Sequence, residues 1–394
     1  MSKGTILYVG GFELPDKNAA AHRVLSNGKI IRELGYKVVF IDVDKELKYG
    51  SDVRNTKHII QEFECWSIPY PSTKVQWINY LSNIDTSIEV LNQYEDVKVI
   101  IAYNYPAIPL WRLKNYCARN SIKIVADCTE WYSTKGQSII FKFIKGIDSL
   151  LRMRVIQKRL DGLIVISSYL KNYYHRSTNV VRVPPLIDIS EEKWNTTVSE
   201  FDSDKLNLVY AGSPGKTKDK LKFFIESLYE FKEVSNFSLN IIGITKEQYI
   251  DVFKELEPKL NQLGEKIVFH GRLSHVDSLK FVMMSDFSVF FRDDTRTTKA
   301  GFPTKFVESI SCGTPVITTR TSDLERYILE GENGFFIDIK DKKNVLLLLS
   351  KVFDMKKEDI NRMKKKCIES NIFYFRNYNN KIRQFLHVIQ SNSE

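Results

Sequence analysis

The feature that most constrains the fold is a regular alternation of short apolar runs with longer amphipathic stretches. Continuous apolar runs are typical of strands covered on both faces, and helices between them imply parallel βαβ units. In the first half, strand patterns occur at Thr5–Val9, Lys37–Val43, Val97–Tyr103, Ile122–Ala126 and Gly162–Ile166. In the second half, they recur at Leu206–Ala211, Ser238–Ile242, Ile267–His270, Phe287–Phe291 and Pro315–Thr319. The sequence therefore predicts an α/β protein with two doubly wound parallel sheets.

A polar, turn-rich segment at residues 184–205 separates the two series and is the best linker candidate. At 394 residues the chain is also too long for one ordinary hydrophobic core. We predict a Rossmann-like N-terminal domain over 1–200 and a Rossmann-like C-terminal domain over 201–371, with a cleft between them. An aromatic-rich helix within 372–394 is expected to pack back on the first domain. Ligands of such sheets bind at the carboxyl ends of the strands.

Composition narrows the class of protein. No apolar run approaches the ~20 residues of a membrane span, and the N-terminus enters a strand pattern without a leader, so we expect a cytoplasmic protein. The five cysteines are far apart in the sequence, which favours reduced thiols over a zinc site. The net charge of +10 is compatible with nucleic acid, an anionic membrane surface or a phosphorylated ligand; no nucleic-acid motif accompanies it, and the charge alone favours none of the three.

The segment KAGFPTKFVESISCGTPVITT, residues 299–319, predicts a short helix with a specialised entrance. Pro303 is suited to the first helical position, and Gly313 to the left-handed residue after the last turn. We therefore predict a helix over Pro303–Cys312.

The start of this helix is a candidate anion site. Free amides near Thr304 would face a ligand, Lys305 adds a positive charge, and Gly301 allows close approach to the backbone. One turn further, Glu308 could accept two hydrogen bonds from a ribose diol. Together these residues outline a nucleotide-diphosphate site, although a solvated or salt-bridged glutamate on an amphipathic helix is the alternative.

The same segment resembles the donor-site signature of the GT-B retaining glycosyltransferases of family 4, and the resemblance extends in domain order over most of the chain. It implies that Glu308 holds the nucleotide ribose. The first of the two glutamates of the family pattern falls on Ala300, so that carboxylate is absent. Lys299, or the backbone at Gly301 and Phe302, is then expected to contact the sugar.

A second basic loop follows the strand Leu206–Ala211. Lys216 and Lys218 lie just before a predicted helix, where cations oppose the helix dipole, so we expect an anionic partner. A solvated lysine cluster is the alternative. In the family this loop carries an arginine and a lysine that clamp the donor diphosphate; the lysine matches Lys218 and the arginine position falls on Ser213. Lys218 and Lys305 are our candidate catalytic cations, which would stabilise the departing diphosphate.

Two further donor-side positions follow from the resemblance. Gly10 and Gly11 come after the first strand, where the family has a glycine-rich loop against the donor phosphate and the acceptor. Arg272 and Leu273 follow a later strand, where backbone groups of the family frame the base. An ordinary turn is the alternative at the second position.

The acceptor side is expected at the end of the strand that closes with DCTEWY, residues 127–132. Asp127 and Glu130 are candidate catalytic carboxylates, since carboxylates accept hydrogen bonds from sugar hydroxyls. The indole of Trp131 could stack on a sugar ring, and Asn104 is a companion from the preceding strand. Local capping of the next helix is the alternative.

Residues 138–160 predict a basic amphipathic helix with a single acid, Asp148. Such a helix can lie on an anionic membrane surface, and a helix packed on the core with a basic outer face is the alternative.

We predict a retaining hexosyltransferase that moves a sugar from a nucleotide-diphosphate donor, expected to be a UDP-sugar, to a hydroxyl of a glycan or lipid-linked glycan, as in surface polysaccharide synthesis. The enzyme is expected in the cytoplasm or on the inner face of the membrane. We expect no cofactor and no nucleic-acid partner. No metal is expected either, since the DxD at Asp42–Asp44 ends an early strand away from the proposed diphosphate site. A sugar-nucleotide epimerase and a non-catalytic sugar-nucleotide binder are the alternatives.

Overall fold

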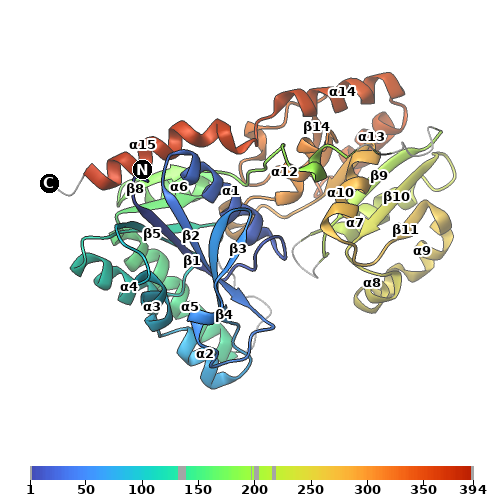
Figure 1. Cartoon of the computed structure of the whole chain (residues 1–394). Coiled ribbons are helices and arrows are strands. Elements are labelled where there is room, and N and C mark those ends of the chain that lie inside the picture. The colour runs from blue at the N-terminus through green and yellow to red at the C-terminus, as the bar shows by residue number, and fades with distance from the viewer. Residues whose placement is uncertain (1, 132–138, 197, 199–203, 215–218, 392–394) are drawn as a thin grey trace. The chain divides into compact units, whose positions relative to one another are not determined.

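The computed structural model describes residues 2–131, 139–196, 198, 204–214 and 219–391, except the side chains of 139–144. The chain divides into two compact units (Figure 1). The N-terminal unit consists of Met1–Ile187, Ala300–Phe302 and Tyr374–Glu394. The C-terminal unit consists of Asp188–Lys299 and Pro303–Phe373. The division thus falls after Ile187 rather than at residue 200, because Ile187 forms a β-bridge with Tyr374 within the N-terminal unit.

The N-terminal unit contains an eight-stranded sheet in the order β3-β4-β2-β1-β5-β6-β7-β8. Strand β3 pairs with β4 in antiparallel sense, and the other pairings between the described strands of this sheet are parallel. The strands are β1 (Thr5–Gly10), β2 (Lys37–Asp44), β3 (His58–Ile60), β4 (Phe63–Pro69), β5 (Val97–Tyr103), β6 (Lys123–Cys128), β7 (Gly162–Val165) and β8 (Asn179–Arg182). The antiparallel edge pair β3–β4 is a feature that the βα alternation did not predict.

The helices of this unit connect and cover the strands. They are α1 (Ala19–Glu33), α2 (Lys74–Tyr80), α3 (Asp85–Leu91), α4 (Ala107–Arg119), α5 (Ile139–Leu151), α6 (Ser168–Tyr174) and the C-terminal α15 (Asn379–Ser391). Helix α15 contacts α1 and β8 and is drawn in red in Figure 1. It begins later than the predicted helix pattern, because Phe375–Tyr378 form a 3₁₀ turn whose first N–H donates to the Ile187 carbonyl.

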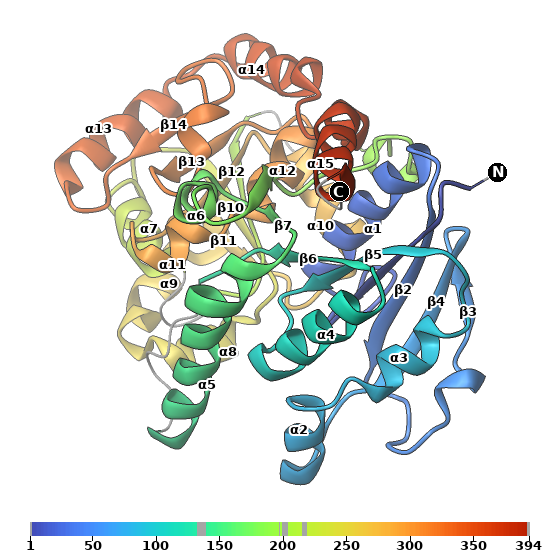
Figure 2. The same cartoon turned by 90° about the vertical axis from the view of Figure 1, so that its left-hand side faces the viewer.

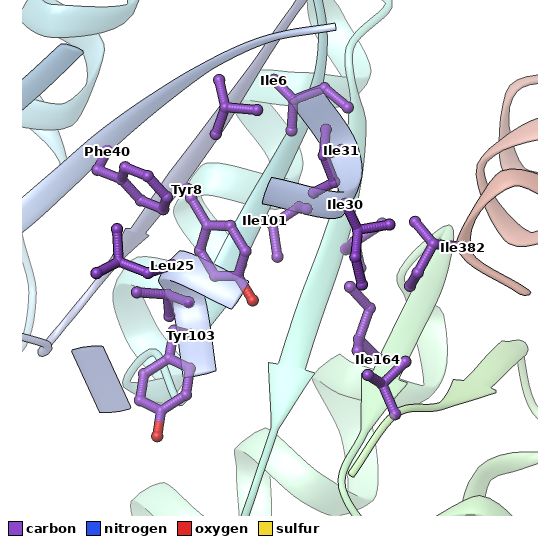
Figure 3. Close-up of a cluster of buried hydrophobic side chains, with 14 of the residues drawn as sticks. Ile6, Tyr8, Leu25, Ile30, Ile31, Phe40, Ile101, Tyr103, Ile164 and Ile382 are labelled. Carbon is purple, nitrogen blue, oxygen red and sulfur yellow. The ribbon is translucent and has the colours of Figure 1, made fainter. Parts of the chain in front are cut away.

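A hydrophobic core joins α15 to the rest of the N-terminal unit (Figure 3). Ile6 of β1, Ile30 of α1, Ile164 of β7 and Ile382 of α15 are each at most 1% exposed. Complete burial of an aliphatic side chain of this size contributes about 1.5–3 kcal/mol. The C-terminal helix is therefore an integral part of the N-terminal unit.

The C-terminal unit contains a six-stranded parallel sheet in the order β11-β10-β9-β12-β13-β14. Its strands are β9 (Leu206–Ala211), β10 (Phe237–Ile242), β11 (Ile267–Phe269), β12 (Phe287–Phe290), β13 (Val316–Thr319) and β14 (Gly334–Ile337). Its helices are α7 (Leu221–Tyr229), α8 (Lys246–Val252), α9 (Glu257–Leu263), α10 (His275–Met284), α11 (Arg296–Ala300), α12 (Thr304–Ser311), α13 (Lys342–Phe353) and α14 (Lys357–Ser370). The predicted fold class, two α/β units built on parallel sheets, is confirmed.

Candidate functional site

The strand order of the C-terminal sheet marks where a ligand should bind. Strands β9 and β12 are neighbours although they are not consecutive, and the chain leaves them toward opposite edges of the sheet. Such a switch point opens a crevice beyond the carboxyl ends of the two strands. The loops after these strands meet there, since the Lys220 N–H donates to the Phe291 carbonyl at 2.8 Å.

A buried ionic cluster lies at this point, consisting of Tyr210, Asp219, Arg292 and Lys305 and called here the Asp219 cluster. Asp219 Oδ2 accepts from Lys305 Nζ at 2.5 Å and from the Tyr210 hydroxyl at 2.6 Å. Its Oδ1 accepts from Arg292 Nε at 2.8 Å. The Lys305 ammonium also lies 3.8 Å from the centroid of the Tyr210 ring. One carboxylate thus organises residues from three separate elements.

The charge states of the cluster follow from its surroundings. Burial alone would raise the pKa of Asp219, but Lys305 and Arg292 outweigh it and hold that pKa well below its usual range. Burial, together with the negative charge of Asp219, raises the pKa of Tyr210 well above its ordinary value. At neutral pH, Asp219 is therefore ionised and Tyr210 is a neutral hydrogen-bond donor.

Glycine is needed for this packing. Gly212, which follows β9, has φ +141°, and a Cβ atom there would lie 2.5 Å from Lys305 Cε. Any larger residue at this position would therefore displace the lysine or the loop.

Helix α12 begins at the same edge of the sheet. It runs from Thr304 to Ser311, with Pro303 as its N-cap rather than as its first helical residue, so the predicted start was one residue early. Pro303 provides no side-chain acceptor for the amides of the first turn, an arrangement suited to an anion. Gly313 follows the helix with φ +77°, as the left-handed end of a helix requires.

Glu308 lies on α12, one turn beyond Lys305. Its side chain is 25% exposed, and its Oε1 is 3.3 Å from Nε2 of His275 at the start of α10. The His275 ring in turn meets Trp194 edge-on, with ring centroids 6.2 Å apart. Glu308 is thus held at the surface of the unit rather than buried in its core.

The other predicted donor-side residues of this unit are more scattered. Ser213 is exposed in the loop after β9, and Lys216 and Lys218 lie outside the described residues. Arg272 is exposed and Leu273 half-buried, after Gly271 with φ +64°. The structure therefore places Lys305 and Glu308 on one helix, α12, where Lys305 contacts Asp219 and Glu308 contacts His275.

Lys299 and the backbone at Gly301 and Phe302, both predicted to contact the donor sugar, have contacts with other parts of the protein. Lys299 forms an exposed ion pair with Asp294 at 2.9 Å. The stretch Ala300–Phe302 groups with the N-terminal unit, where the Ser167 hydroxyl donates to the Ala300 carbonyl at 2.8 Å. Ala300 is completely buried, and Phe302 is 7% exposed, so Gly301 is flanked by two buried side chains.

Gly10 and Gly11 differ in how much space is available for a side chain. A Cβ atom on Gly10 would lie 2.7 Å from the Tyr103 carbonyl of the neighbouring strand, so packing within the sheet explains this glycine. Gly11 is exposed, with the Tyr80 hydroxyl 3.3 Å from its hypothetical Cβ.

The expectation that Asp127 projects toward a sugar is wrong. Its side chain is 0% exposed and pairs with Arg23 of α1 at 2.7 Å, and it also accepts hydrogen bonds from Tyr8 at 2.5 Å and Asn27 at 3.3 Å. Arg23 in turn donates to the Val183 carbonyl at 2.9 Å. Asp127 thus ties β6 to α1, and we remove it from the catalytic candidates.

The remaining acceptor-side candidates lie beyond β5 and β6. Asn104 has φ +42° and donates to Thr129 at 2.6 Å and to Glu130 at 3.4 Å. Trp131 is half-buried and packs edge-on against Tyr173, with ring centroids 5.1 Å apart. Asn104, Glu130 and Trp131 therefore occupy one edge of the N-terminal sheet, with local contacts of their own.

The predicted amphipathic segment is interrupted. Helix α5 ends at Leu151 and a π-helical turn follows over Arg152–Ile156. Arg152, a basic residue of the predicted amphipathic segment 138–160, is 3% exposed and donates to the Asn104 carbonyl at 3.1 Å. Asp148 accepts from the Ala107 N–H at 2.6 Å and thereby caps α4. Among the residues of α5 whose side chains are described, Ile147, Leu150 and Leu151 are exposed large apolar residues.

In the part of the chain that the structure describes, no three His, Cys, Asp or Glu side chains gather as a metal would require. No helix among the described residues combines the length and the apolar character of a membrane span. The five cysteines are all free and buried, as expected for reduced thiols.

Known proteins share both the pattern and the fold. Residues 205–352 match the family model described as Glycosyl transferases group 1. Sucrose-phosphate synthase from Thermosynechococcus elongatus matches with TM-score 0.74 at 13% identity, covering 99% of this chain and 100% of that chain. A glycosyltransferase from Rickettsia africae matches with TM-score 0.71 at 14% identity, covering 100% of both chains. Anabaena HepE in complex with UDP-glucose matches with TM-score 0.66 at 12% identity, covering 98% and 99%.

No curated protein sequence matches the chain. The structural matches nevertheless cover nearly the whole chain, and they show that it has the GT-B fold. Its C-terminal unit carries the sequence pattern of the group 1 glycosyl transferases, so the predicted resemblance is confirmed at the level of GT-B group 1 glycosyltransferases.

Proposed function

We propose that the protein is a retaining glycosyltransferase that transfers a sugar from a UDP-sugar donor to a hydroxyl of a glycan or lipid-linked glycan. The observation that carries the proposal is the grouping of Lys305, the uncapped start of α12 and Glu308 at the switch point of the C-terminal sheet. The amides and the lysine suit a diphosphate, and the carboxylate suits a ribose diol. Two structural neighbours are complexes with UDP-glucose and with UDP-2-fluoro glucose.

In this mechanism the protein stabilises the departing diphosphate. Negative charge develops on the leaving phosphate as the bond to the sugar breaks, and Lys305 with the α12 amides would lower the energy of that state. Lys218 is proposed to act with them. Loss of one such donor costs about 10²–10³ in rate by analogy with oxyanion holes. The reaction is proposed to need no metal, so turnover should be the same in excess EDTA.

The test begins with donor binding. Ligand at 100 times its dissociation constant adds about 2.7 kcal/mol of stability, so UDP, ADP and GDP are compared by thermal shift. The variant Lys305→Gln should lose the shift, whereas Lys340→Gln, an exposed lysine of the same unit, should keep it. Equal shifts in both variants would argue against the site.

Product analysis tests the reaction itself. With the donor that binds, transfer to a glycan acceptor should give a product with the anomeric configuration of the donor, as read by NMR. An inverted product contradicts the retaining mechanism. Isomerised donor in the absence of acceptor favours an epimerase, and donor binding without turnover favours a sugar-nucleotide binder.

We also propose that the N-terminal unit binds an anionic membrane surface. Helices α4 and α5 are in contact (Figure 2), and Asp148 of α5 accepts from the first N–H of α4. Ile108 and Trp111 of α4 and Ile147 and Leu150 of α5 are exposed. Lys145, Arg154 and Arg159 belong to the same basic segment of the sequence as α5. An apolar patch beside basic residues suits anionic lipid.

Vesicle sedimentation tests this surface. Vesicles of phosphatidylglycerol and phosphatidylcholine should bind the protein at low salt, and pure phosphatidylcholine should not. The double variant Trp111→Glu, Leu150→Glu should stay in the supernatant. Equal binding of both vesicle types would contradict the proposal.

A further inference from the structure

The Asp219 cluster holds more positive than negative charge. Its single carboxylate, 2% exposed, faces the guanidinium of Arg292 and the ammonium of Lys305, whose side chains are only 11% and 13% exposed. Tyr210 contributes a neutral hydroxyl. The four residues of the cluster thus carry one negative and two positive charges, and paired cations of this kind suit an anionic ligand.

Arg292 is fixed at two points and uses only part of its guanidinium. The backbone N–H of Arg292 donates to the Thr319 hydroxyl at 2.9 Å, and the backbone carbonyl of Arg292 accepts from the same hydroxyl at 2.8 Å. Its side chain donates to Asp219 through Nε, while the other carboxylate oxygen is occupied by Lys305 and Tyr210. Within the part of the chain that the structure describes, the two terminal nitrogens of Arg292 make no hydrogen bond.

The position of Arg292 adds to this argument. It is two residues past the end of β12 and so lies at the crevice between β9 and β12, where ligands of open α/β sheets bind. A guanidinium presents paired N–H groups that match two oxygens of one phosphate. Arg292 is oriented by the hydrogen bond from its Nε to Asp219, and its two terminal nitrogens can therefore donate to the oxygens of one phosphate group.

We propose that Arg292 is a second cation of the donor-diphosphate site, oriented by Asp219 and acting beside Lys305. The inference rests on the proposed function, because it assigns a further residue to the same donor site. Arg292 is not among the diphosphate cations of the sequence prediction, which are Lys216 and Lys218 of the loop after β9 and Lys305 of α12.

Titration calorimetry with UDP and, by displacement, with uridine tests Arg292. The variant Arg292→Gln should lose about 10- to 100-fold in UDP affinity, as expected for lost hydrogen bonds to a charged group. Its affinity for uridine should stay unchanged, because uridine has no phosphate. Arg320→Gln, an exposed arginine of the same unit paired with Glu325, is the control and should bind UDP like the wild type.

Each outcome separates this inference from the proposed function. If the wild type binds none of UDP, ADP and GDP, the proposed function fails. If the wild type binds UDP and Arg292→Gln binds it equally, the function stands and the role of Arg292 is refuted. Should Arg292→Gln not fold, Arg292→Lys decides, because lysine keeps the pair with Asp219 but lacks the paired nitrogens. Wild-type UDP affinity in that variant would also refute the role.

Discussion

The replacement Asp219→Asn gives the sharpest test of how the C-terminal unit is held together. Asparagine has nearly the same shape as aspartate, so the variant removes the charge and leaves Arg292 and Lys305 without their shared counter-ion. Removing one partner of a buried ion pair costs about 3–5 kcal/mol. For a unit of this size each kcal/mol corresponds to about 2–4 °C. We therefore expect the Tm of this unit to fall by roughly 6–20 °C.

The pH dependence of the Tm difference between the wild type and Asp219→Asn distinguishes a paired from an unpaired carboxylate. The pKa of Asp219 is well below its usual range in the folded protein, whereas in the unfolded chain it is about 4. The stabilisation is therefore fully present above about pH 4 and is lost as the pH falls through the folded pKa.

Calorimetry from pH 8 to pH 3 measures the Tm of the wild type and of Asp219→Asn. The control is Asp251→Asn, at an exposed position on α8, which should keep the wild-type Tm. The gap between wild type and Asp219→Asn should be constant from pH 8 to pH 5 and narrow only near pH 4 and below. A gap that closes between pH 7 and pH 5 would refute the reasoning, because Asp219 would then take up a proton in the folded state.

Three other predictions concern separate parts of the chain. Asp127→Asn should destabilise the N-terminal unit by about 3–5 kcal/mol in urea unfolding, because Asp127 and Arg23 form a buried pair, yet leave UDP affinity intact; weaker UDP binding by the folded variant would contradict a purely structural role for Asp127. Wild-type protein should bind UDP about tenfold more tightly than 2′-deoxy-UDP, and Glu308→Ala should abolish that preference; a preference that persists would remove Glu308 from the ribose site. Burial raises the pKa of Cys128 to about 12, and all five thiols are buried, so Ellman's reagent at pH 8 should find fast-reacting thiols only after denaturation.

The fold was largely predictable because its signal is local. A buried parallel strand needs a continuous apolar run, and β5 coincides with the predicted Val97–Tyr103. The chain between Ile372 and Tyr378 was mistaken for helix, because its aromatic spacing fits a helix while its backbone pairs with Ile187. That pairing joins distant parts of the chain and leaves no local trace.

The candidate site was predictable only where its residues are close together in sequence. The signature segment contains both Lys305 and Glu308, and one helix holds them. Asp219 was missed because a lone aspartate in a lysine-rich loop reads as a solvated residue. Its partners Arg292 and Lys305 are 73 and 86 residues away, and only the strand order brings them together.

The two buried aspartates differ in how their charge is balanced, and this difference separates their roles. Asp127 faces one cation, Arg23, and its other partners, Tyr8 and Asn27, are neutral. That group is neutral overall, so it needs no ligand to complete it. Asp219 faces two cations, Arg292 and Lys305, near the switch point. Asp127 lies within β6, whereas Asp219 lies in the loop between β9 and α7. The roles proposed for them follow this difference: one cation on one carboxylate forms a structural ion pair, whereas two cations on one carboxylate suit the proposed anion site.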